Sequence, residues 1–289
     1  MGKYILAQTL EEALDALERY RDKARVISGA TDLLPLIKNG EIKVDCIVDI
    51  TNVTDLNYIN YDNGLIRIGA LVTHSEVESS PIISERATLL AEASRFVGSP
   101  QIRNRGTVVG NVANASRAAD TPLALIALDA EAKVVSKNRE RIERVEDLFV
   151  ESGQTSLKTE ELITELRFQE LRPEQGGAFI KLAKRRALAI AAVNVATVIT
   201  VDKEKRVFSD ARIAVGCVVP KPQRAKRAEE ALIGHSINGE TIRSACQEIA
   251  EEVSPRTGIH GSAEYKREMT KILVARTIKN SLGRIKWEG

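Results

Sequence analysis

The sequence predicts a mixed α+β protein of 289 residues, with α/β units in its first part and a sheet followed by helices in its last. Two observations predict this class. Residues 1–50 read as strand, helix, strand, helix and strand in turn, which is typical of an α/β unit. Residues 177–289 give three strand-like segments and then two or three helical segments, the order expected of an α+β domain.

The first unit has three short apolar segments that we interpret as strands, YILA (4–7), RVIS (25–28) and CIVDI (46–50). Between the first two, Thr9 and Glu12 have the spacing of a capping box at the start of a helix. Apolar residues then recur at helical spacing up to Tyr20. The second strand is followed at once by Gly29, by Thr31 and Asp32, and by the apolar segment LLPLIK, so a strand, a glycine turn and a helix start are adjacent.

The middle of the chain alternates strand signals with helix signals. NGLIRIGA (63–70) joins a turn to an alternating strand, and THSE (73–76) is a second capping box. One helix is expected over residues 84–97, with Pro100 closing it, and another over Thr121–Leu128 with Asp120 or Thr121 as its cap. Strands are expected at 131–137 and 163–168. Between the helices, residues 97–120 show no hydrophobic period and predict a long loop, which in a compact chain is often functional.

RPEQGG (172–177) is the best candidate for a linker. Beyond it, three successive strands are expected over residues 177–185, 190–202 and 207–218, followed by helices over 225–233, 239–253 and 262–282.

Composition and charge exclude several function classes. The formal net charge of +2, from 42 basic and 40 acidic residues, and the 4% of aromatic residues argue against a nucleic-acid partner. No apolar run approaches the roughly 18 residues of a transmembrane helix, and the N-terminus turns polar too early for a signal peptide. The three cysteines and three histidines are dispersed, so we expect neither disulfides nor a zinc or iron–sulfur site, and a cytoplasmic location.

Two segments have the residues to hold a phosphate-bearing ligand. In VISGATDL (26–33), unpaired N–H groups at a strand–glycine–helix junction suit a pyrophosphate, although the same pattern also describes an ordinary capped turn. In RGTVVGNVANAS (105–116), Gly106 and Gly110 allow close backbone approach, and Thr107, Asn111 and Ser116 offer short polar groups; a plain surface loop is the alternative. We find no nucleophile–base pair or GxSxG motif. The residues therefore indicate a cofactor holder without acid–base chemistry of its own.

Taken together, the two segments resemble a known family. The order SGATDL, IGALVTHSEV and GSPQIRNRGTVVGNVANASRAADTPLALIALDAEAKV is similar to the FAD-binding medium subunit of the molybdenum hydroxylases, such as xanthine dehydrogenase and aerobic carbon monoxide dehydrogenase. The likeness continues through SLKTEELITEL, FIKLAKRRALAIAAVNVA and GSAEYKREMTKILVAR, and so covers essentially the whole chain.

The resemblance implies the vanillyl-alcohol-oxidase (PCMH) type of FAD-binding fold, with two α/β subdomains and a C-terminal three-stranded sheet with helices. It places the N-terminal FAD-binding subdomain at residues 1–55, the middle one at 56–173 and the C-terminal domain, of the CO dehydrogenase flavoprotein type, at 174–289.

The resemblance also implies which residues bind FAD. The pyrophosphate loop falls on Val26–Leu33, the second FAD loop on Thr107–Asn111, and Asp120 stands where members use an aspartate near the sugar-like part of FAD. Leu162 and Ile163 match apolar positions that pack on the flavin ring, and Lys181 matches a lysine near the flavin. The region around Ala189 and Ile190 faces the ring where the second substrate or electron acceptor approaches. The full set is Val26, Ile27, Ser28, Gly29, Ala30, Thr31, Asp32, Leu33, Val97, Gln101, Thr107, Val108, Val109, Gly110, Asn111, Ser116, Asp120, Leu162, Ile163 and Lys181.

Four positions depart from the family pattern. Ala30 and Val109 stand where a glycine is usual, Arg117 replaces a proline, and Ala189 replaces an aspartate. A β-branched residue does not readily take a positive φ, so Val109 is expected to hinder the backbone beside the pyrophosphate. Arg117 is a candidate for an additional phosphate contact.

For function, the resemblance implies an FAD-carrying electron-transfer subunit of a cytoplasmic heterotrimer. A small subunit with [2Fe-2S] clusters would supply electrons, a large subunit with the molybdenum cofactor would oxidise the substrate, and NAD or a quinone would accept electrons from FAD. Two alternatives stay open: a flavin-poor structural subunit of the same complex, which Val109 and Ala189 favour, and a stand-alone flavoprotein oxidoreductase of the same fold. The dispersed cysteines predict no additional [4Fe-4S] cluster.

Overall fold

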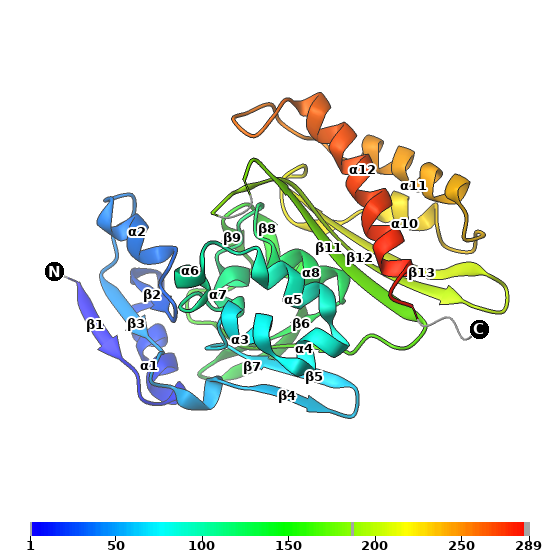
Figure 1. The fold of residues 1–289 in the computed structure, drawn as a ribbon. Helices are drawn as coiled ribbons and strands as arrows, with labels where there is room; N and C mark the ends of the chain where they lie inside the picture. Colours follow the sequence, from blue (N-terminus) through cyan, green and yellow to red (C-terminus); the bar gives the residue numbers. More distant parts are fainter. Residues whose placement is uncertain (1, 186–187, 286–289) are drawn as a thin grey trace.

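The computed structural model describes residues 2–185 and 188–285, and its chain forms three main sheets with helices packed on them (Figure 1). The N-terminal unit has a parallel sheet in the order β1 (Lys3–Leu6), β3 (Cys46–Asp49) and β2 (Ala24–Ile27). Helix α1 (Leu10–Tyr20) and the 3-10 turn η1 (Arg21–Lys23) connect β1 to β2, and α2 (Leu33–Lys38) follows β2. The predicted β-α-β-α-β order is confirmed.

Helix α1 begins where the sequence predicts. The Thr9 hydroxyl accepts a hydrogen bond from the Glu12 N–H, but the Glu12 carboxylate accepts from the Gln8 N–H, so the box is displaced by one residue. Ala13 and Leu17 are among the residues that the helix buries against the rest of the unit. The apolar face of α1 therefore holds in place the sheet whose strand β2 leads into the turn at Gly29.

The middle unit is built on an antiparallel sheet in the order β4 (Ile59–Asp62), β5 (Leu65–Gly69), β10 (Leu162–Gln169), β6 (Glu131–Ser136) and β7 (Arg139–Arg144). Smaller elements complete it, namely η2 (Thr54–Leu56), α9 (Val145–Leu148), β8 (Phe149–Glu151) and β9 (Gln154–Thr155). Strands β4 and β5 form a hairpin, with Asn63 and Gly64 both at positive φ, as their turn signal predicts.

The helices between β5 and β6 correct the sequence reading. They are α3 (His74–Ser79), α4 (Pro81–Arg86), α5 (Thr88–Arg95), α6 (Pro100–Arg103), α7 (Val108–Ala113) and α8 (Thr121–Ala127). The single helix expected over 84–97 is wrong, because Ala87 has φ −150° and ψ 48° and separates α4 from α5. Pro100 begins α6 instead of closing a helix, since proline fits the first turn of a helix.

The long loop expected over residues 97–120 is likewise wrong. It contains α6 and α7, and each has a side-chain cap: Ser99 accepts from the Ile102 N–H, and Thr107 accepts from the Gly110 N–H. Helices of 4 and 6 residues are too short to display a hydrophobic period, which is why the pattern missed them.

The C-terminal part has an antiparallel sheet in the order β11 (Gln175–Ala183), β12 (Ala191–Asp202), β13 (Val207–Gly216) and β14 (Gln223–Arg224). The three predicted strands are present, and β14 is an addition of 2 residues that carries no pattern. Three helices follow, α10 (Lys226–Glu230), α11 (Gly239–Glu252) and α12 (Ala263–Leu282).

The linker expected at 172–177 is wrong in its second half, because β11 already begins at Gln175. A Cβ on Gly176 would lie 1.9 Å from the Ser281 carbonyl oxygen. The glycine thus lets the backbone of α12 approach the sheet closely.

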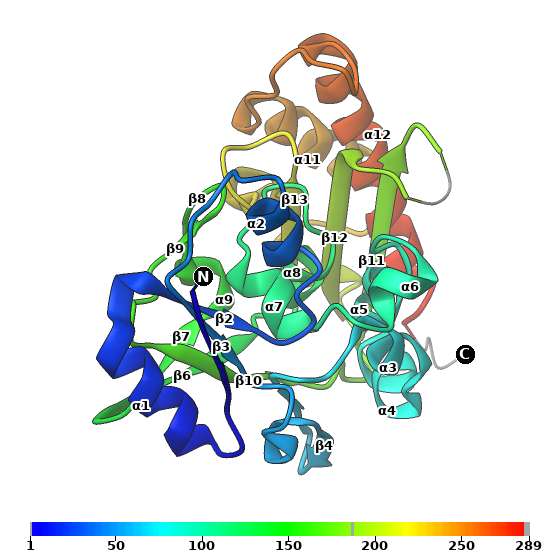
Figure 2. The same ribbon diagram turned by 90° about the vertical axis from the view of Figure 1, so that its left-hand side faces the viewer.

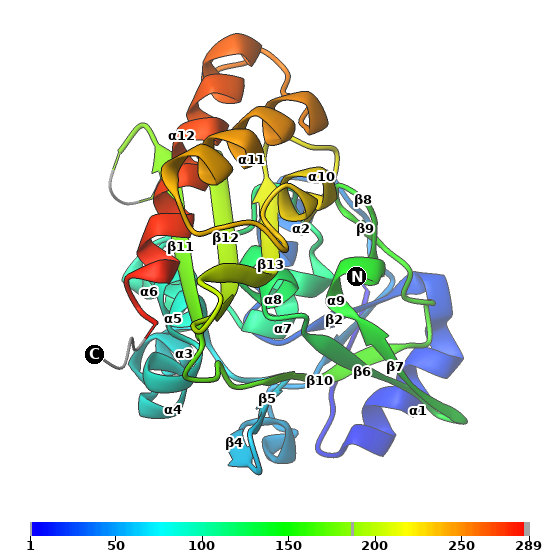
Figure 3. The same cartoon turned by 90° about the vertical axis from the view of Figure 1, so that its right-hand side faces the viewer.

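The C-terminal sheet is covered on both faces. Helices α5 and α8 of the middle unit pack on one face, and α10 and α12 pack on the other, with α11 on the outside (Figures 1 and 3). The core of the N-terminal and middle units extends onto this sheet through Phe179, Ala196 and Ala214. In the described residues, no helix is long and apolar enough to cross a membrane.

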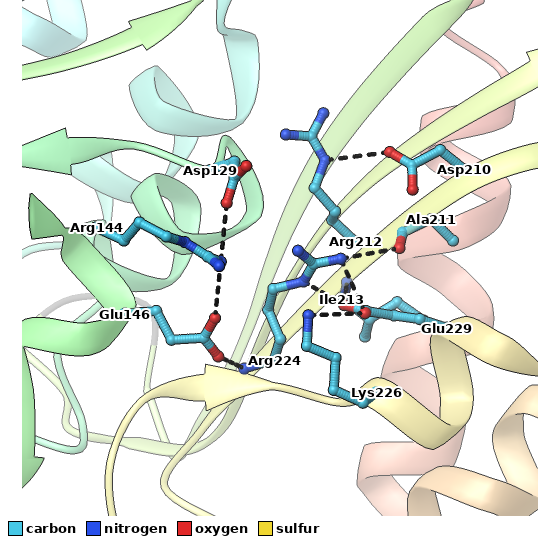
Figure 4. Close-up of polar contacts among 10 residues, drawn as sticks. All are labelled: Asp129, Arg144, Glu146, Asp210, Ala211, Arg212, Ile213, Arg224, Lys226 and Glu229. Atoms are coloured by element: carbon cyan, nitrogen blue, oxygen red, sulfur yellow. Dashed lines mark hydrogen bonds and ion pairs between the residues drawn. The ribbon is translucent and has the colours of Figure 1, made fainter.

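A chain of ionic contacts also joins the middle unit to the C-terminal part (Figure 4). Arg144 contacts both Asp129 (2.9 Å) and Glu146 (3.2 Å), and Glu146 Oε1 accepts a 2.7 Å hydrogen bond from the Arg224 backbone N–H. The Arg224 guanidinium binds both oxygens of the buried Glu229 carboxylate, at 2.7 and 2.9 Å. Since each oxygen of Glu229 has a donor, its charge is compensated where water is excluded.

Candidate functional site

A cavity of about 940 Å³ lies between the N-terminal unit, helix α7 with the residues that precede α8, and the segment after β11. Figure 2, which views the molecule from the side of β1–β3, shows α2 in front of α7 and α8. The wall takes residues from the loop between β2 and α2, from the 106–120 segment, from β10 and from β11. Segments far apart in the sequence therefore enclose one space.

All but two of the predicted FAD-binding residues line this cavity. They are Val26, Ile27, Ser28, Gly29, Ala30, Thr31, Asp32, Leu33, Val97, Thr107, Val109, Gly110, Asn111, Ser116, Asp120, Leu162, Ile163 and Lys181. The lining does not include Gln101, which is exposed on α6, or Val108, which is buried and donates its N–H to the Val72 carbonyl. Arg117, the candidate for a phosphate contact, is also absent from the lining.

The two glycine-containing loops touch each other at Gly29. A Cβ at this position would lie 2.0 Å from the Arg105 carbonyl oxygen and 2.8 Å from the Gly106 Cα. Beside this contact, the hydroxyls of Ser28 and Thr107 are 3.0 Å apart and share a hydrogen bond. No other residue type fits at position 29 without separating the loops.

The first loop contributes unpartnered backbone N–H groups to the cavity wall. Across the described part of the chain, the amides of Ala30, Thr31 and Asp32 meet no protein acceptor. In the second loop, Thr107 Oγ1 accepts from the Gly110 N–H at 3.0 Å and so fixes the start of α7. Unpartnered amides that point into a cavity suit an anion such as a phosphate.

The expectation for Val109 is wrong, and the strained position is a different one. Val109 lies in α7 with helical backbone and is 5% exposed, so its side chain packs into the core instead of forcing a positive φ. Ala30 has φ 60°, the left-handed conformation that favours glycine. The left-handed backbone at position 30 thus explains why the family usually has a glycine there.

A buried ion pair forms another part of the wall. Lys181 Nζ lies 2.6 Å from Asp120 Oδ2, and the two side chains are 6% and 5% exposed. Asp120 Oδ1 accepts a 3.0 Å hydrogen bond from Asn194 Nδ2, and Lys181 also donates to the Phe96 carbonyl. Burial raises the pKa of the Asp120 carboxyl, and Lys181 and Asn194 oppose that rise. Burial beside Asp120 also raises the pKa of the Cys217 thiol to about 12, so this thiol stays protonated and unreactive.

Apolar residues and the segment after β11 complete the wall. Leu162 and Ile163 of β10 are buried, and Leu188, Ala189 and Ile190 follow β11. The Leu188 N–H donates to the Gly98 carbonyl at 3.3 Å, which ties this segment to the region before α6. The predicted position of Ala189 and Ile190 at the site is consistent with their place in the lining.

Several lining residues were not predicted. Glu161 binds Arg141 through both carboxylate oxygens, at 3.1 and 2.9 Å, and this contact lowers its pKa against the opposing effect of burial. His74 had been interpreted only as part of a capping box, and no other sequence signal marks it. Apolar residues of the N-terminal unit also contribute, among them Leu17, Leu36 and Ile42.

In the described residues, no group of three or more His, Cys, Asp or Glu side chains is placed to hold a metal ion. The chemistry of the wall therefore rests on amides, hydroxyls, one buried ion pair and an apolar face. These groups can bind and orient a cofactor.

Comparison with known proteins decides which cofactor. Residues 1–168 match the family described as the FAD binding domain in molybdopterin dehydrogenase, and residues 178–281 match the CO dehydrogenase flavoprotein C-terminal domain. The chain belongs to this family. It is an FAD-binding medium subunit of the molybdenum hydroxylases, and thus part of an oxidoreductase.

Individual relatives agree over the full length. The medium subunit of nicotine 6-hydroxylase from Paenarthrobacter nicotinovorans is 34% identical over 276 residues, covering 96% of this chain and 95% of that protein. The FAD-subunit of nicotinate dehydrogenase from Eubacterium barkeri is 33% identical, covering 92% of this chain and 91% of that protein. A structure of carbon monoxide dehydrogenase from Hydrogenophaga pseudoflava superimposes with a TM-score of 0.94 at 28% identity, covering 99% and 98% of the two chains. The predicted fold class, family and cofactor are confirmed.

The cavity of this FAD subunit fits a dinucleotide. Its volume lies near the upper end of the roughly 300–1,000 Å³ range of ligand pockets. The unpartnered amides beside Gly29 suit a diphosphate, and the apolar residues of β10 suit an aromatic ring system. The residues present therefore match the two chemically different parts of FAD.

Proposed function

We propose that this cavity holds FAD and that the subunit passes electrons from a [2Fe-2S] subunit to NAD or another acceptor. The observation that carries the proposal is the contact of the two glycine-containing loops at Gly29, which brings unpartnered N–H groups to one cavity. When bound, FAD stores electrons and exchanges them with a partner, chemistry that belongs to the cofactor.

The chain's own residues would bind, orient and shield the cofactor. The unpartnered amides of residues 30–32 would hold the diphosphate without a basic side chain. Leu162 and Ile163 would pack on the flavin ring, and the Asp120–Lys181 pair would set the charge beside it. The segment 188–190, which is part of the lining, would lie where an electron acceptor approaches.

The three domains of the proposal keep the predicted boundaries, 1–55, 56–173 and 174–289. FAD would then lie mainly between the first two, with Lys181 reaching the cavity from the third. Of the two residues that favour the flavin-poor alternative, Val109 no longer supports it, since it is helical and does not strain the loop, and Ala189 remains.

One pair of variants tests the cavity as the FAD site. In Gly29→Ala, the new methyl group would overlap the Arg105 carbonyl, so we expect the purified chain to lose its flavin absorbance. Gly239→Ala is the matched control, because only the end of the Arg243 side chain lies near its Cβ position, at 3.6 Å. Equal flavin content in the two variants would refute the assignment of the cavity.

A second variant covers the case in which Gly29→Ala fails to fold. Thr107→Val keeps the shape of the side chain but removes the hydroxyl that accepts from Gly110 and bonds with Ser28. Because these two bonds hold the loops in place, we expect FAD affinity to fall about tenfold, a loss of roughly 1.4 kcal/mol of binding free energy. Unchanged affinity measured by fluorescence titration would count against the loop assignment.

The proposed partners are tested by purification through a tag on this chain. We expect an iron–sulfur subunit and a molybdenum subunit to be recovered with it, and the reduced complex to transfer electrons to NAD or to a quinone. Recovery of the flavin-loaded chain alone would favour the stand-alone flavoprotein. In the described residues no membrane-spanning helix is present, and we propose a cytoplasmic location for the complex.

A further inference from the structure

His74 is a cavity-lining residue whose place is fixed by the second loop. It is the first residue of α3 and is 2% exposed. Its N–H donates to the Gly106 carbonyl at 3.0 Å, and the Val108 N–H donates to the Val72 carbonyl at 3.1 Å. Residues 72–74 thus pair with residues 106–108 around the isolated bridge between Thr73 and Thr107.

One edge of the His74 ring lies where the two loops meet. A Cβ on Gly106 would be 3.4 Å from His74 Cδ2 and 3.2 Å from Thr31 Oγ1, and all three residues line the cavity. Nε2 is the ring atom next to Cδ2, so it belongs to this edge. Nδ1 is on the other side of the ring, where it is buried and has no hydrogen-bond partner in the described part of the chain.

The surroundings keep the ring uncharged. Burial and, to a smaller extent, the charge of Arg103 lower the pKa of His74 to about 4. A neutral imidazole carries one N–H and one lone pair. Buried N–H groups without an acceptor are rarer than under-satisfied acceptors, which favours the tautomer with its N–H on Nε2 at the cavity edge.

Among the residues that the structure describes, the lining offers a diphosphate no buried basic side chain that lacks an acidic partner. Its two basic residues are Arg25 and Lys181. Arg25 donates to the carbonyls of Asp22 and Ala24, and Lys181 is paired with Asp120. Neutral groups are therefore the buried donors left for the anion, and His74 is the one imidazole among the described lining residues.

We propose that His74 is a cofactor-binding residue whose Nε2–H donates a hydrogen bond to a diphosphate oxygen of FAD. This inference rests on the proposed function, in which the loops around Gly29 and Gly106 hold the diphosphate. His74 would then close the gap between the two loops with a donor that needs no protonation. The role is distinct from that of the α3 capping box, which uses Thr73 and Glu76.

The test compares two replacements of His74 in the full chain stripped of flavin. His74→Leu removes the donor and keeps a similar volume, and His74→Gln restores an N–H at a similar reach. We expect His74→Leu to weaken the binding of FAD and of ADP, a diphosphate probe, by about tenfold or more, since the acceptor is charged. His74→Gln should recover most of this affinity. His235→Gln, at an exposed site, is the control and should bind like the wild type.

A spectroscopic measurement on the wild type does not depend on whether a His74 variant folds. The chain has only three histidines, so the ring ¹⁵N signals of His74 can be assigned by elimination from the spectra of His235→Gln and His260→Gln. We expect the Nε2–H tautomer at His74 before FAD is added and a shift of its Nε2 signal afterwards. An unchanged signal, or equally weak binding by His74→Gln and His74→Leu, would show that the ring only packs.

Failure of this inference can be told apart from failure of the proposed function. If the wild type binds FAD, Gly29→Ala does not, and His74→Leu binds within twofold of the wild type, only the role of His74 is overturned. If Gly29→Ala binds FAD as the wild type does, the cavity itself is the wrong site and the His74 proposal falls with it.

Discussion

The buried His74 ring makes stability depend on pH. Its pKa is lowered from the ordinary 6.5 to about 4, so between these values the unfolded chain takes up a proton that the folded chain does not. The free energy of unfolding therefore rises with pH through this window and falls as the solution is acidified. Since a tenfold change in proton affinity is worth about 1.4 kcal/mol, the whole effect amounts to about 3 kcal/mol.

Denaturant unfolding of the flavin-free chain at pH 7.5 and pH 4.5 measures this effect. At pH 4.5 the folded ring is still mostly neutral, and protonation of His74 in the unfolded chain has lowered the free energy of unfolding by about 2.5 kcal/mol. Other groups also titrate over this range, so the quantity of interest is the loss in the wild type minus the loss in His74→Gln. This difference cancels the constant effect of the substitution and the contribution of the carboxylates.

The expected difference is about 2.5 kcal/mol, with the wild type losing more stability than His74→Gln. His235→Gln should lose as much as the wild type, because its ring is exposed and makes no buried contact. If the wild type and His74→Gln lose the same free energy between the two pH values, His74 is not buried in the uncharged form, and the reasoning on its tautomer fails too.

Three further substitutions test the wall of the cavity. Lys181→Met leaves the buried Asp120 unpaired and should lower the free energy of unfolding, measured with denaturant, by about 3–5 kcal/mol. Lys133→Met is the control: it breaks an exposed ion pair and should lower the free energy of unfolding by less than about 1 kcal/mol. Ala30→Gly relieves a left-handed φ and should raise the unfolding free energy by up to about 1 kcal/mol without loss of bound FAD; a decrease would contradict the backbone assignment. Val109→Gly should lower the free energy of unfolding by about 3 kcal/mol, and a titration should show that it binds FAD no more tightly than the wild type does. Tighter binding would mean that the Val109 side chain hinders the cofactor after all.

Short local signals were sufficient for much of the fold. The cap at Thr9, the Asn63–Gly64 turn and the apolar strands are formed by neighbouring residues, so their patterns are visible in the sequence. The same is not true of α6 and α7, which span 4 and 6 residues and depend on caps at Ser99 and Thr107. A helix this short has less than two turns and cannot express a period of 3.6 residues.

For the candidate site too, some features could be predicted from the sequence and others only from the tertiary structure. The sequence by itself determined the order of the main strands, the two loops and the family, because these depend on residue identity and local spacing. Only the tertiary structure decided that Ala30 takes the left-handed conformation, that Lys181 reaches Asp120, and that His74 lies between the loops. Each of these depends on contacts between segments far apart in the chain, and on the burial they produce, which no local pattern encodes.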